Sequence, residues 1–225
     1  MHRIDAYTTT HQQGLYRDKN MIRPFFIALQ FLTRLPVRIS SAPDEISVAY
    51  SLGYYPLVGL IIGAILTSAA WVLSAGLLLL VWVFITGGLY LDGLADSMDA
   101  WVGGLGDREK TLAIMKDPYC GPAGVVSIVL LLLLKFVALH TIMESGNLTI
   151  ILLAPLFGRA VLLPLFLTTP YVRSNGLGTP ISSCLPRKLI LIIFIATLAG
   201  VFFLVGINCL WLMLMMMLFF CAHDF

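Results

Sequence analysis

The sequence predicts an all-α protein, a polytopic transmembrane helical bundle with about six spans and a short interfacial or re-entrant helix near the N-terminus. Two observations support this fold class. Hydrophobic residues make up 59% of the 225 residues and charged residues only 12%, whereas soluble domains have about 25% charged residues. The apolar residues also gather into runs of about 20, the length that a helix needs to cross the hydrocarbon core.

The apolar runs assign the elements in order along the chain. The first 24 residues are polar and lack the apolar core of a signal peptide, so they predict a flexible tail before one integral-membrane domain over 25–225. The segment FFIALQFLTRLPV at 25–37 is too short to cross the bilayer, and we expect it to be interfacial or re-entrant. The expected spans are 50–71, 72–91, 121–142, 149–169, 189–206 and 208–222.

The basic residues predict how these spans are oriented. Of the 14 Lys and Arg residues, six precede residue 50, three lie in 92–118, three lie in 170–188, and Lys135 and Arg159 fall within spans. With six spans the three basic segments share one side, and the opposite connections hold no Lys or Arg. The positive-inside rule makes the basic side cytoplasmic.

The composition argues against two further classes of site. The net charge is only +2, and no basic stripe with interleaved aromatic residues indicates a nucleic-acid partner. The four cysteines show neither a CxxC pair nor the spacing of a metal finger.

Three aspartates, Asp92, Asp96 and Asp99, follow the second apolar run in the segment LYLDGLADSMDAWVGG. If the helix continues past Leu91, their spacing places them within about a 60° arc and along roughly 10 Å of helix. Neighbouring like charges destabilise a helix, and desolvation near a membrane boundary increases the cost. Magnesium offsets that cost, because it binds a few carboxylates and fills its other positions with water and substrate phosphates. The row predicts Mg²⁺ ligands facing a diphosphate; a solvated helix end is the alternative.

Other residues near the row are candidates for the same site. Gly87, Gly88 and Gly93 allow close approach of a substrate to the backbone. Asp107 is expected to cap a short helix, REKTLAIMK. Asp117 either returns toward the row through a hairpin-like connection or is an ordinary turn residue before Pro118.

Several basic residues are candidate anion ligands. Lys135 and Arg159 lie inside apolar spans, where a charge needs a partner or a polar cavity, so each either binds an anion or forms a structural ion pair. Arg173 and Gly176 lie in a Gly-rich loop that either contacts a phosphate or nucleotide or is an ordinary membrane loop, which also needs a basic residue and turn formers. Arg108, Lys110 and Lys116 either bind phosphate or are solvated surface charges.

Several motifs, in order from about residue 25 to 180, resemble the cobalamin-5′-phosphate synthase family, the adenosylcobinamide-GDP ribazoletransferases. They are ALQFLTRLPV, YYPLVGLIIG, GGLYLDGLADSMDAWVGG, DREKTLAIMKDPYCGPAGV, LLLLLKFVAL and GRAVLLPLFLTTPYVRSNGLG. The DGLAD block with the following IMKD is the specific part of this resemblance.

The resemblance implies a multi-pass, Mg²⁺-dependent enzyme of a bacterial inner membrane, with its site facing the cytoplasm. It implies that the adenosylcobinamide phosphoryl group is transferred from adenosylcobinamide-GDP to α-ribazole or its 5′-phosphate, and that GMP is released. The candidate catalytic residues are Asp92, Asp96, Asp99, Asp117, Lys135 and Arg159, the first three as metal ligands; the candidate substrate-binding residues are Gly93, Arg108, Lys116, Arg173 and Gly176.

The chain departs from the family pattern at its C-terminus. Family members usually continue past the last apolar stretch into a segment like GGxTGDxxGA, whereas this chain stops at FFCAHDF. This difference predicts a membrane domain that is truncated at its C-terminus.

Three alternative functions differ in kind. A CDP-alcohol phosphotransferase also has a DGxxA helix with spaced aspartates, but it has Arg where this chain has Asp96. An intramembrane prenyltransferase typically has two DxxxD rows, and this sequence shows one. A small transporter with an acidic gate requires an acidic ring or a repeat, and neither is evident.

Overall fold

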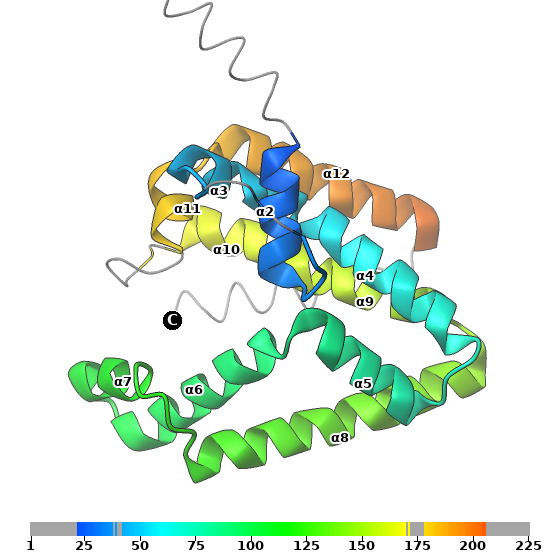
Figure 1. Cartoon of the computed structure of the whole chain (residues 1–225), viewed down its shortest axis with the longest axis horizontal. Helices are drawn as coiled ribbons and strands as arrows, with labels where there is room; N and C mark the ends of the chain where they lie inside the picture. Colours follow the sequence, from blue (N-terminus) through cyan, green and yellow to red (C-terminus); the bar gives the residue numbers. More distant parts are fainter. Residues whose placement is uncertain (1–21, 38, 40–41, 170, 172–177, 206–225) are drawn as a thin grey trace, which may run out of the picture. The chain divides into compact units, whose positions relative to one another are not determined.

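The regular structure is helical throughout the residues that the computed structural model describes, which are 22–37, 39, 42–169, 171 and 178–205 (Figure 1). The helices are α2 (Arg23–Leu32), α3 (Glu45–Ser51), the 3-10 helix η1 (Leu52–Tyr54), α4 (Tyr55–Ala70), α5 (Ala75–Thr86), α6 (Leu89–Gly104), α7 (Arg108–Ile114), α8 (Pro122–Ser145), α9 (Thr149–Ala160), α10 (Leu162–Thr168), α11 (Thr179–Ser183) and α12 (Arg187–Val205). This composition confirms the all-α prediction.

Among the described residues, four helical segments are long and apolar enough to cross a membrane: Glu45–Ala70, Pro122–Ser145, Thr149–Thr168 and Arg187–Val205. A fifth candidate is the pair α5 and α6, which are bent by 86° at the break between them. These segments confirm a multi-pass helical membrane protein. The expected span 208–222 and residues 1–21 of the expected tail 1–24 lie outside the described residues, and the last two residues of that tail, Arg23 and Pro24, belong to α2.

One of the predicted spans is wrong in its limits. We expected 72–91 to be continuous, but α5 ends at Thr86 and α6 begins at Leu89. The hydropathy of the segment does not reveal the break, because the two intervening glycines lie among apolar residues on both sides. The short segment at 25–37 forms α2 over Arg23–Leu32, which is shorter than a span, as expected.

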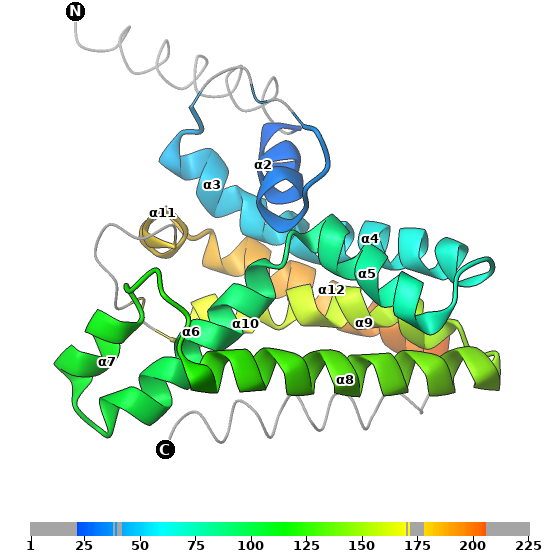
Figure 2. The same ribbon diagram turned by 60° about the horizontal axis from the view of Figure 1, so that its bottom comes forward.

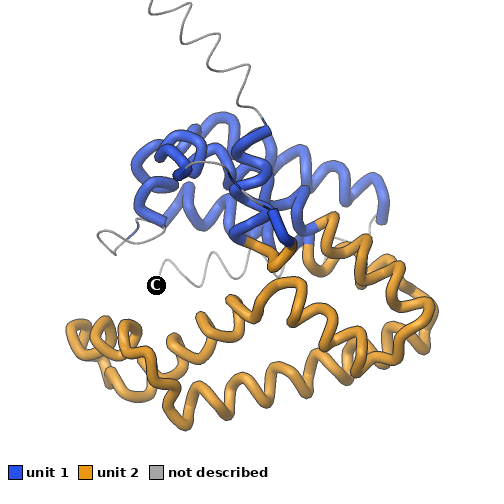
Figure 3. Tube along the Cα trace, in the orientation of Figure 1, with its two compact units in different colours: residues 1–31, 36–59, 156–225 blue, residues 32–35, 60–155 orange. Residues whose placement is uncertain are grey.

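The described residues form two compact units, coloured separately in Figure 3, whose boundaries fall within α4 and α9 and on either side of the short segment 32–35. In the first unit, α3 packs against α11, and α12 packs against α10 and η1. Gly53 of η1 lies against α12, where an added Cβ would come within 2.8 Å of Ile193 Cδ1. Leu52, Leu163 and Ile190 form part of the fully buried core of this unit.

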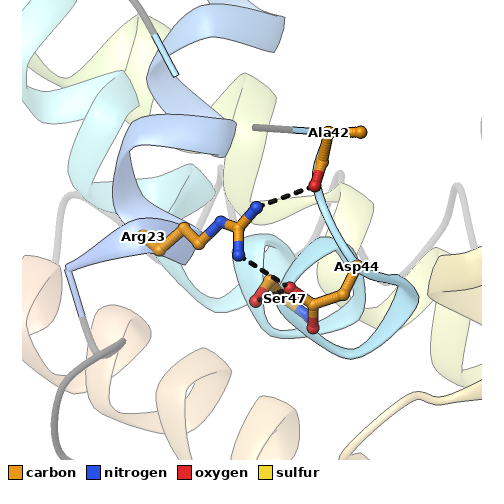
Figure 4. Close-up of polar contacts among 4 residues, drawn as sticks. All are labelled: Arg23, Ala42, Asp44 and Ser47. Atoms are coloured by element: carbon orange, nitrogen blue, oxygen red, sulfur yellow. Dashed lines mark hydrogen bonds and ion pairs between the residues drawn. The ribbon is translucent and has the colours of Figure 1, made fainter. Parts of the chain in front are cut away.

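A polar cluster joins α2 to the start of α3 in the same unit (Figure 4). Arg23 Nη2 donates to the carbonyl oxygen of Ala42 at 2.8 Å, and its Nη1 lies 3.3 Å from Asp44 Oδ1. The Asp44 carboxylate caps α3 by accepting from both the backbone N–H of Ser47, at 3.0 Å, and the Ser47 hydroxyl, at 2.8 Å.

The second unit contains α5, α6, α7 and α8 together with 32–35, the later part of α4 and the start of α9. Both α5 and α6 pack against the long helix α8, and α7 packs against α6 (Figure 2). Gly63 of α4 lies against the backbone of α9 at Leu152, with no room for a Cβ. Such small residues allow close helix packing, as is common in membrane proteins.

Candidate functional site

The predicted aspartate row lies on one helix, α6, which includes Asp92, Asp96 and Asp99. This placement confirms the i, i+4, i+7 arrangement. Asp92 is exposed, whereas Asp96 and Asp99 are half-buried. However, α6 is not the continuation of the preceding span that the sequence suggested.

Two left-handed glycines produce the break before the row. Gly87 has φ 65° and Gly88 has φ 68°, a conformation that side chains with a Cβ rarely adopt. The N–H of Gly87 donates to the Phe84 carbonyl at 3.2 Å, and that of Gly88 donates to the Val83 carbonyl at 3.2 Å. These bonds terminate α5, and the chain then restarts as α6 in a new direction.

Arg34 covers this break, a role that was not among the sequence-based predictions. Its backbone N–H donates to the Ile85 carbonyl at 2.7 Å, so it satisfies an oxygen left open at the end of α5. Its side chain lies against Gly87, where a Cβ would collide with Arg34 Nε and Cγ. Arg34 is the one basic residue in the apolar segment 25–37. A single charge in an apolar segment was the feature of the sequence that could have indicated a structural role for Arg34.

Asp99 caps a different helix. Its Oδ2 accepts from the backbone N–H of Gly121 at 2.7 Å, and its Oδ1 accepts from the N–H of Gly124 at 2.8 Å. Gly121 is the N-cap residue of α8 and has no side chain to do this itself. An added Cβ would come within 2.6 Å of the Asp99 carboxylate at Gly121 and within 2.5 Å at Gly124, so both glycines make room for it.

The thiol of Cys120 lies within the field of the whole row. Desolvation raises its pKa, and the negative charges of Asp99, Asp96 and Asp92 raise it further, Asp99 also through a hydrogen bond. Three carboxylates acting on one exposed thiol indicate that the row forms a concentrated negative potential beside the connection into α8.

The segment after α6 is organised by two further aspartates. Asp107 caps α7, as predicted, by accepting from the N–H groups of Glu109, at 2.9 Å, and Lys110, at 3.2 Å. Asp117 Oδ1 accepts from the N–H of Tyr119 at 3.0 Å. This bond is typical of a turn residue, which was one of the two roles that the sequence allowed for Asp117. A catalytic role for Asp117 stays a prediction. Arg108 and Lys116 are exposed at this end of the unit.

The intramembrane basic residues lie in different units. Lys135 of α8 has its ammonium 4.2 Å from the ring centroid of Trp82 and 4.2 Å from that of Tyr90. Arg159 is half-buried in the last turn of α9.

Arg173 and Gly176, two of the candidate substrate-binding residues, lie outside the described residues. Among the described residues, no atom lies within 4 Å of the position that a Cβ at Gly93 would take, so packing against them does not require glycine there.

The donor set of α6 fits magnesium as a protein usually binds it. Within the described ranges, no group of three or more His, Cys, Asp or Glu residues is arranged to hold a metal ion. Magnesium, however, usually takes one or two carboxylates and completes its shell with water and substrate phosphates. Asp92 and Asp96, one turn apart on α6, supply two such carboxylates. The assignment of Asp92, Asp96 and Asp99 as magnesium ligands stays a prediction.

The fold and site together define a multi-pass helical membrane protein with a carboxylate row on a helix that follows a broken span. A family model described as cobalamin-5-phosphate synthase matches residues 24–225. The chain belongs to this family, which confirms the resemblance noted from its motifs.

Curated relatives agree with this assignment. The chain is 54% identical over 172 residues to the adenosylcobinamide-GDP ribazoletransferase of Pseudomonas putida (strain W619), covering 73% of this chain and 70% of the relative. It is 48% identical over 199 residues to the protein of the same name from Pseudomonas entomophila (strain L48), covering 85% and 82%. No solved structure matches the chain. The prediction of an enzyme of the transferase class, rather than a transporter, is confirmed by these relationships.

Proposed function

We propose that this protein transfers the adenosylcobinamide phosphoryl group from adenosylcobinamide-GDP to α-ribazole or its 5′-phosphate and releases GMP. The observation that supports it most directly is the placement of Asp92 and Asp96 on α6, in a chain matched by the synthase family over 24–225. Relatives that are about half identical to this chain are named for a transfer between these two substrates.

In the proposed reaction a hydroxyl oxygen of the ribazole attacks the phosphorus that carries cobinamide. The new P–O bond forms as the bond from that phosphorus to the bridging oxygen breaks, and this oxygen leaves with GMP. The hydroxyl proton passes to a general base. Catalysis of such transfers comes mostly from positioning and from stabilising charge on the phosphoryl oxygens.

Asp92 and Asp96 would hold magnesium, with Asp99 adjacent to them on the same helix. A bound Mg²⁺ neutralises negative charge on the diphosphate and on the departing phosphate. Asp99 is already hydrogen-bonded to α8, but each carboxylate oxygen retains a second lone pair. Arg108 and Lys116 are proposed to bind the anionic substrates, and Gly93 is proposed to admit them close to α6. The catalytic role of Arg159 and the substrate-binding roles of Arg173 and Gly176 stay predictions.

The site is proposed to face the cytoplasm from the inner membrane. The basic residues before residue 50, in 92–118 and in 170–188 support this orientation, since the connections 71–74 and 146–148 hold no Lys or Arg.

Turnover in membrane vesicles tests the reaction. We expect GMP to be released with adenosylcobinamide-GDP and α-ribazole in the presence of Mg²⁺. No product is expected from CDP-diacylglycerol with an alcohol, or from a prenyl diphosphate. Product from CDP-diacylglycerol instead would overturn the proposal in favour of a CDP-alcohol phosphotransferase.

Charge-removing variants test the assignment of the site. Asp92→Asn and Asp96→Asn should insert and fold as the wild type does, but kcat should fall on the order of 10²–10³-fold, the loss typical when a group that stabilises transition-state charge is removed. Glu109→Gln, which removes an exposed carboxylate from nearby α7, is the matched control and should keep wild-type turnover. A fully active Asp96→Asn variant would contradict the metal assignment.

A further inference from the structure

Lys135 places a charge near the middle of α8, the 24-residue helix Pro122–Ser145. A charged side chain at this depth in a bilayer is costly unless it faces a partner or a polar cavity. The sequence left open whether Lys135 binds an anion or forms a structural ion pair. Its contacts in the second unit indicate a further role, which does not depend on either alternative.

The ammonium of Lys135 lies over two aromatic rings that belong to different helices. Trp82 is in α5, before the break at Gly87 and Gly88, and Tyr90 is in α6, after it. Both ring centroids are 4.2 Å from Nζ, within the range of cation–π attraction, which is strongest where the cation is desolvated. Trp82 is 8% exposed, so its ring is held in place by packing.

Such a contact adds a constraint on the break between α5 and α6, beside the packing of both helices against α8 and the contact of Arg34 with Gly87. Two consecutive glycines give the backbone wide freedom, and the hydrogen bonds at this point end α5 without fixing the direction of α6. Lys135 contacts both sides of the break at once. The 86° bend therefore has a side-chain constraint that connects α5, α6 and α8.

A second attachment lies further along α6. Asp99 holds the N-terminus of α8 through Gly121 and Gly124, while Tyr90 contacts α8 through Lys135. Asp92 and Asp96 lie between these two attachment points in the sequence of α6. Fixing both ends fixes the direction in which the two carboxylates are presented.

We propose that Lys135 is a positioning residue, which clamps the bend between α5 and α6 through the rings of Trp82 and Tyr90 and so orients Asp92 and Asp96. The consequence for catalysis rests on the proposed function; the clamp itself does not. The clamp requires a cation at 135 and aromatic rings at 82 and 90.

Distances between spin labels measure the clamp directly. In a cysteine-free full-length chain, labels at Leu77 and Val102, both exposed, report the angle between α5 and α6. The wild type should give one narrow distance distribution. Lys135→Met and Tyr90→Leu should each broaden it, and the double variant should add little, because both remove the same contact. Trp82→Leu should act in the same way if it folds.

Two further variants control for nonspecific effects. Lys135→Arg keeps a cation that stacks on aromatic rings, so this variant should keep the narrow distance distribution of the wild type. Lys110→Met removes a lysine from the exposed surface of α7 and should leave it unchanged. A narrow distribution in Lys135→Met and in Tyr90→Leu would overturn the proposal.

Activity then separates positioning from substrate binding. Lys135→Met and Tyr90→Leu should lower kcat by similar factors, about 10–100-fold, since small displacements of positioned groups cost up to about 10²-fold, and Lys135→Arg should recover most of the loss. A loss confined to Lys135 variants, with Tyr90→Leu fully active, would instead indicate substrate contact and contradict the proposal. If the wild type shows no GMP release while the label distances behave as expected, the proposed function fails and the clamp stands.

Discussion

At the scale of single residues, the three carboxylates of α6 differ in their surroundings although their spacing is regular. Asp92 is exposed, whereas Asp99 accepts two backbone hydrogen bonds from the start of α8. An anionic cap at a helix N-terminus satisfies open N–H groups and interacts favourably with the helix dipole. Asp99 therefore contributes to stability whether or not it also contacts a metal.

The loss of stability caused by substitutions at Asp99 should increase as fewer hydrogen-bond acceptors are retained. Asp99→Ala leaves the N–H groups of Gly121 and Gly124 without this cap and should cost about 1–2 kcal/mol. Asp99→Asn keeps one carboxamide oxygen and should cost less. Asp92→Ala should be close to neutral for stability, since Asp92 is exposed. Thermal unfolding in detergent measures the series, and equal midpoints for Asp99→Ala and the wild type would show that the cap is unimportant.

The Asp44 cap at the start of α3 should make stability depend on pH. Partial desolvation raises the pKa of Asp44, but the hydrogen bonds from Ser47 and the charge of Arg23 outweigh it, so the pKa is lowered overall. The folded state therefore favours the carboxylate. This stabilisation is present above about pH 4, where the unfolded carboxyl is ionised, and is lost as the pH falls through the lowered value.

The stability difference between the wild type and Asp44→Asn measures this effect. It should be constant from pH 7 to about pH 5 and should shrink in more acidic solution. Ser47→Ala, which removes the hydroxyl donor, should make the difference smaller at neutral pH. A difference that grows on acidification would mean that the direction of the pKa shift is wrong.

At the scale of elements, the break between α5 and α6 depends on two glycines with different surroundings. No described residue lies within 4 Å of the position that a Cβ at Gly88 would take, so the expected cost of Gly88→Ala is the conformational cost of a positive φ, about 1–2 kcal/mol. Gly88→Asn should cost less, because Asn tolerates this region. Gly87→Ala should cost more than Gly88→Ala, since the Arg34 side chain occupies the space.

A double-variant comparison separates the two contributions at Gly87. Arg34→Ala should relieve the collision but not the backbone strain, so Gly87→Ala combined with Arg34→Ala should destabilise less than the sum of the single variants. Unfolding midpoints in detergent give the coupling. Strict additivity would show that Arg34 does not constrain Gly87.

Elements defined by local signals could be predicted from the sequence, and those defined by distant contacts could not. The helix through Asp92, Asp96 and Asp99 follows from its periodicity, and α7 begins at Asp107 because its cap is local. The cap of α8 comes from Asp99, 22 residues before Gly121, so no local pattern reveals it. The contacts of Lys135 with Trp82 and Tyr90 likewise depend on how three helices pack.

At the scale of the whole molecule, composition was sufficient to predict a helical membrane protein, and the motifs were sufficient for its family. Hydropathy placed the spans around Glu45–Ala70, Pro122–Ser145 and Thr149–Thr168 to within a few residues at most ends. It did not indicate whether α5 and α6 cross the bilayer together. A broken span and a re-entrant loop have the same apolar length, but they place every later connection on opposite sides of the membrane.

The distribution of charge favours a crossing by the bent pair. If α5 and α6 cross, the basic residues Arg108, Lys110 and Lys116 lie on the same side as those before residue 50, and the connection 71–74 lies opposite. If the pair returns to the side it entered, these three residues join the side of 71–74, against the positive-inside rule. The orientation of the proposed site follows from this distinction.

Cysteine accessibility should therefore place residues 74 and 109 on opposite sides. In a cysteine-free chain in intact cells, Ser74→Cys and Asn147→Cys should react with a membrane-impermeant maleimide, whereas Glu109→Cys should react only after permeabilisation. Because the re-entrant arrangement puts 74 and 109 on one side and 147 on the other, matching reactivity of Ser74→Cys and Glu109→Cys would refute the crossing. Turnover measured for each variant verifies that the labelled chains are folded.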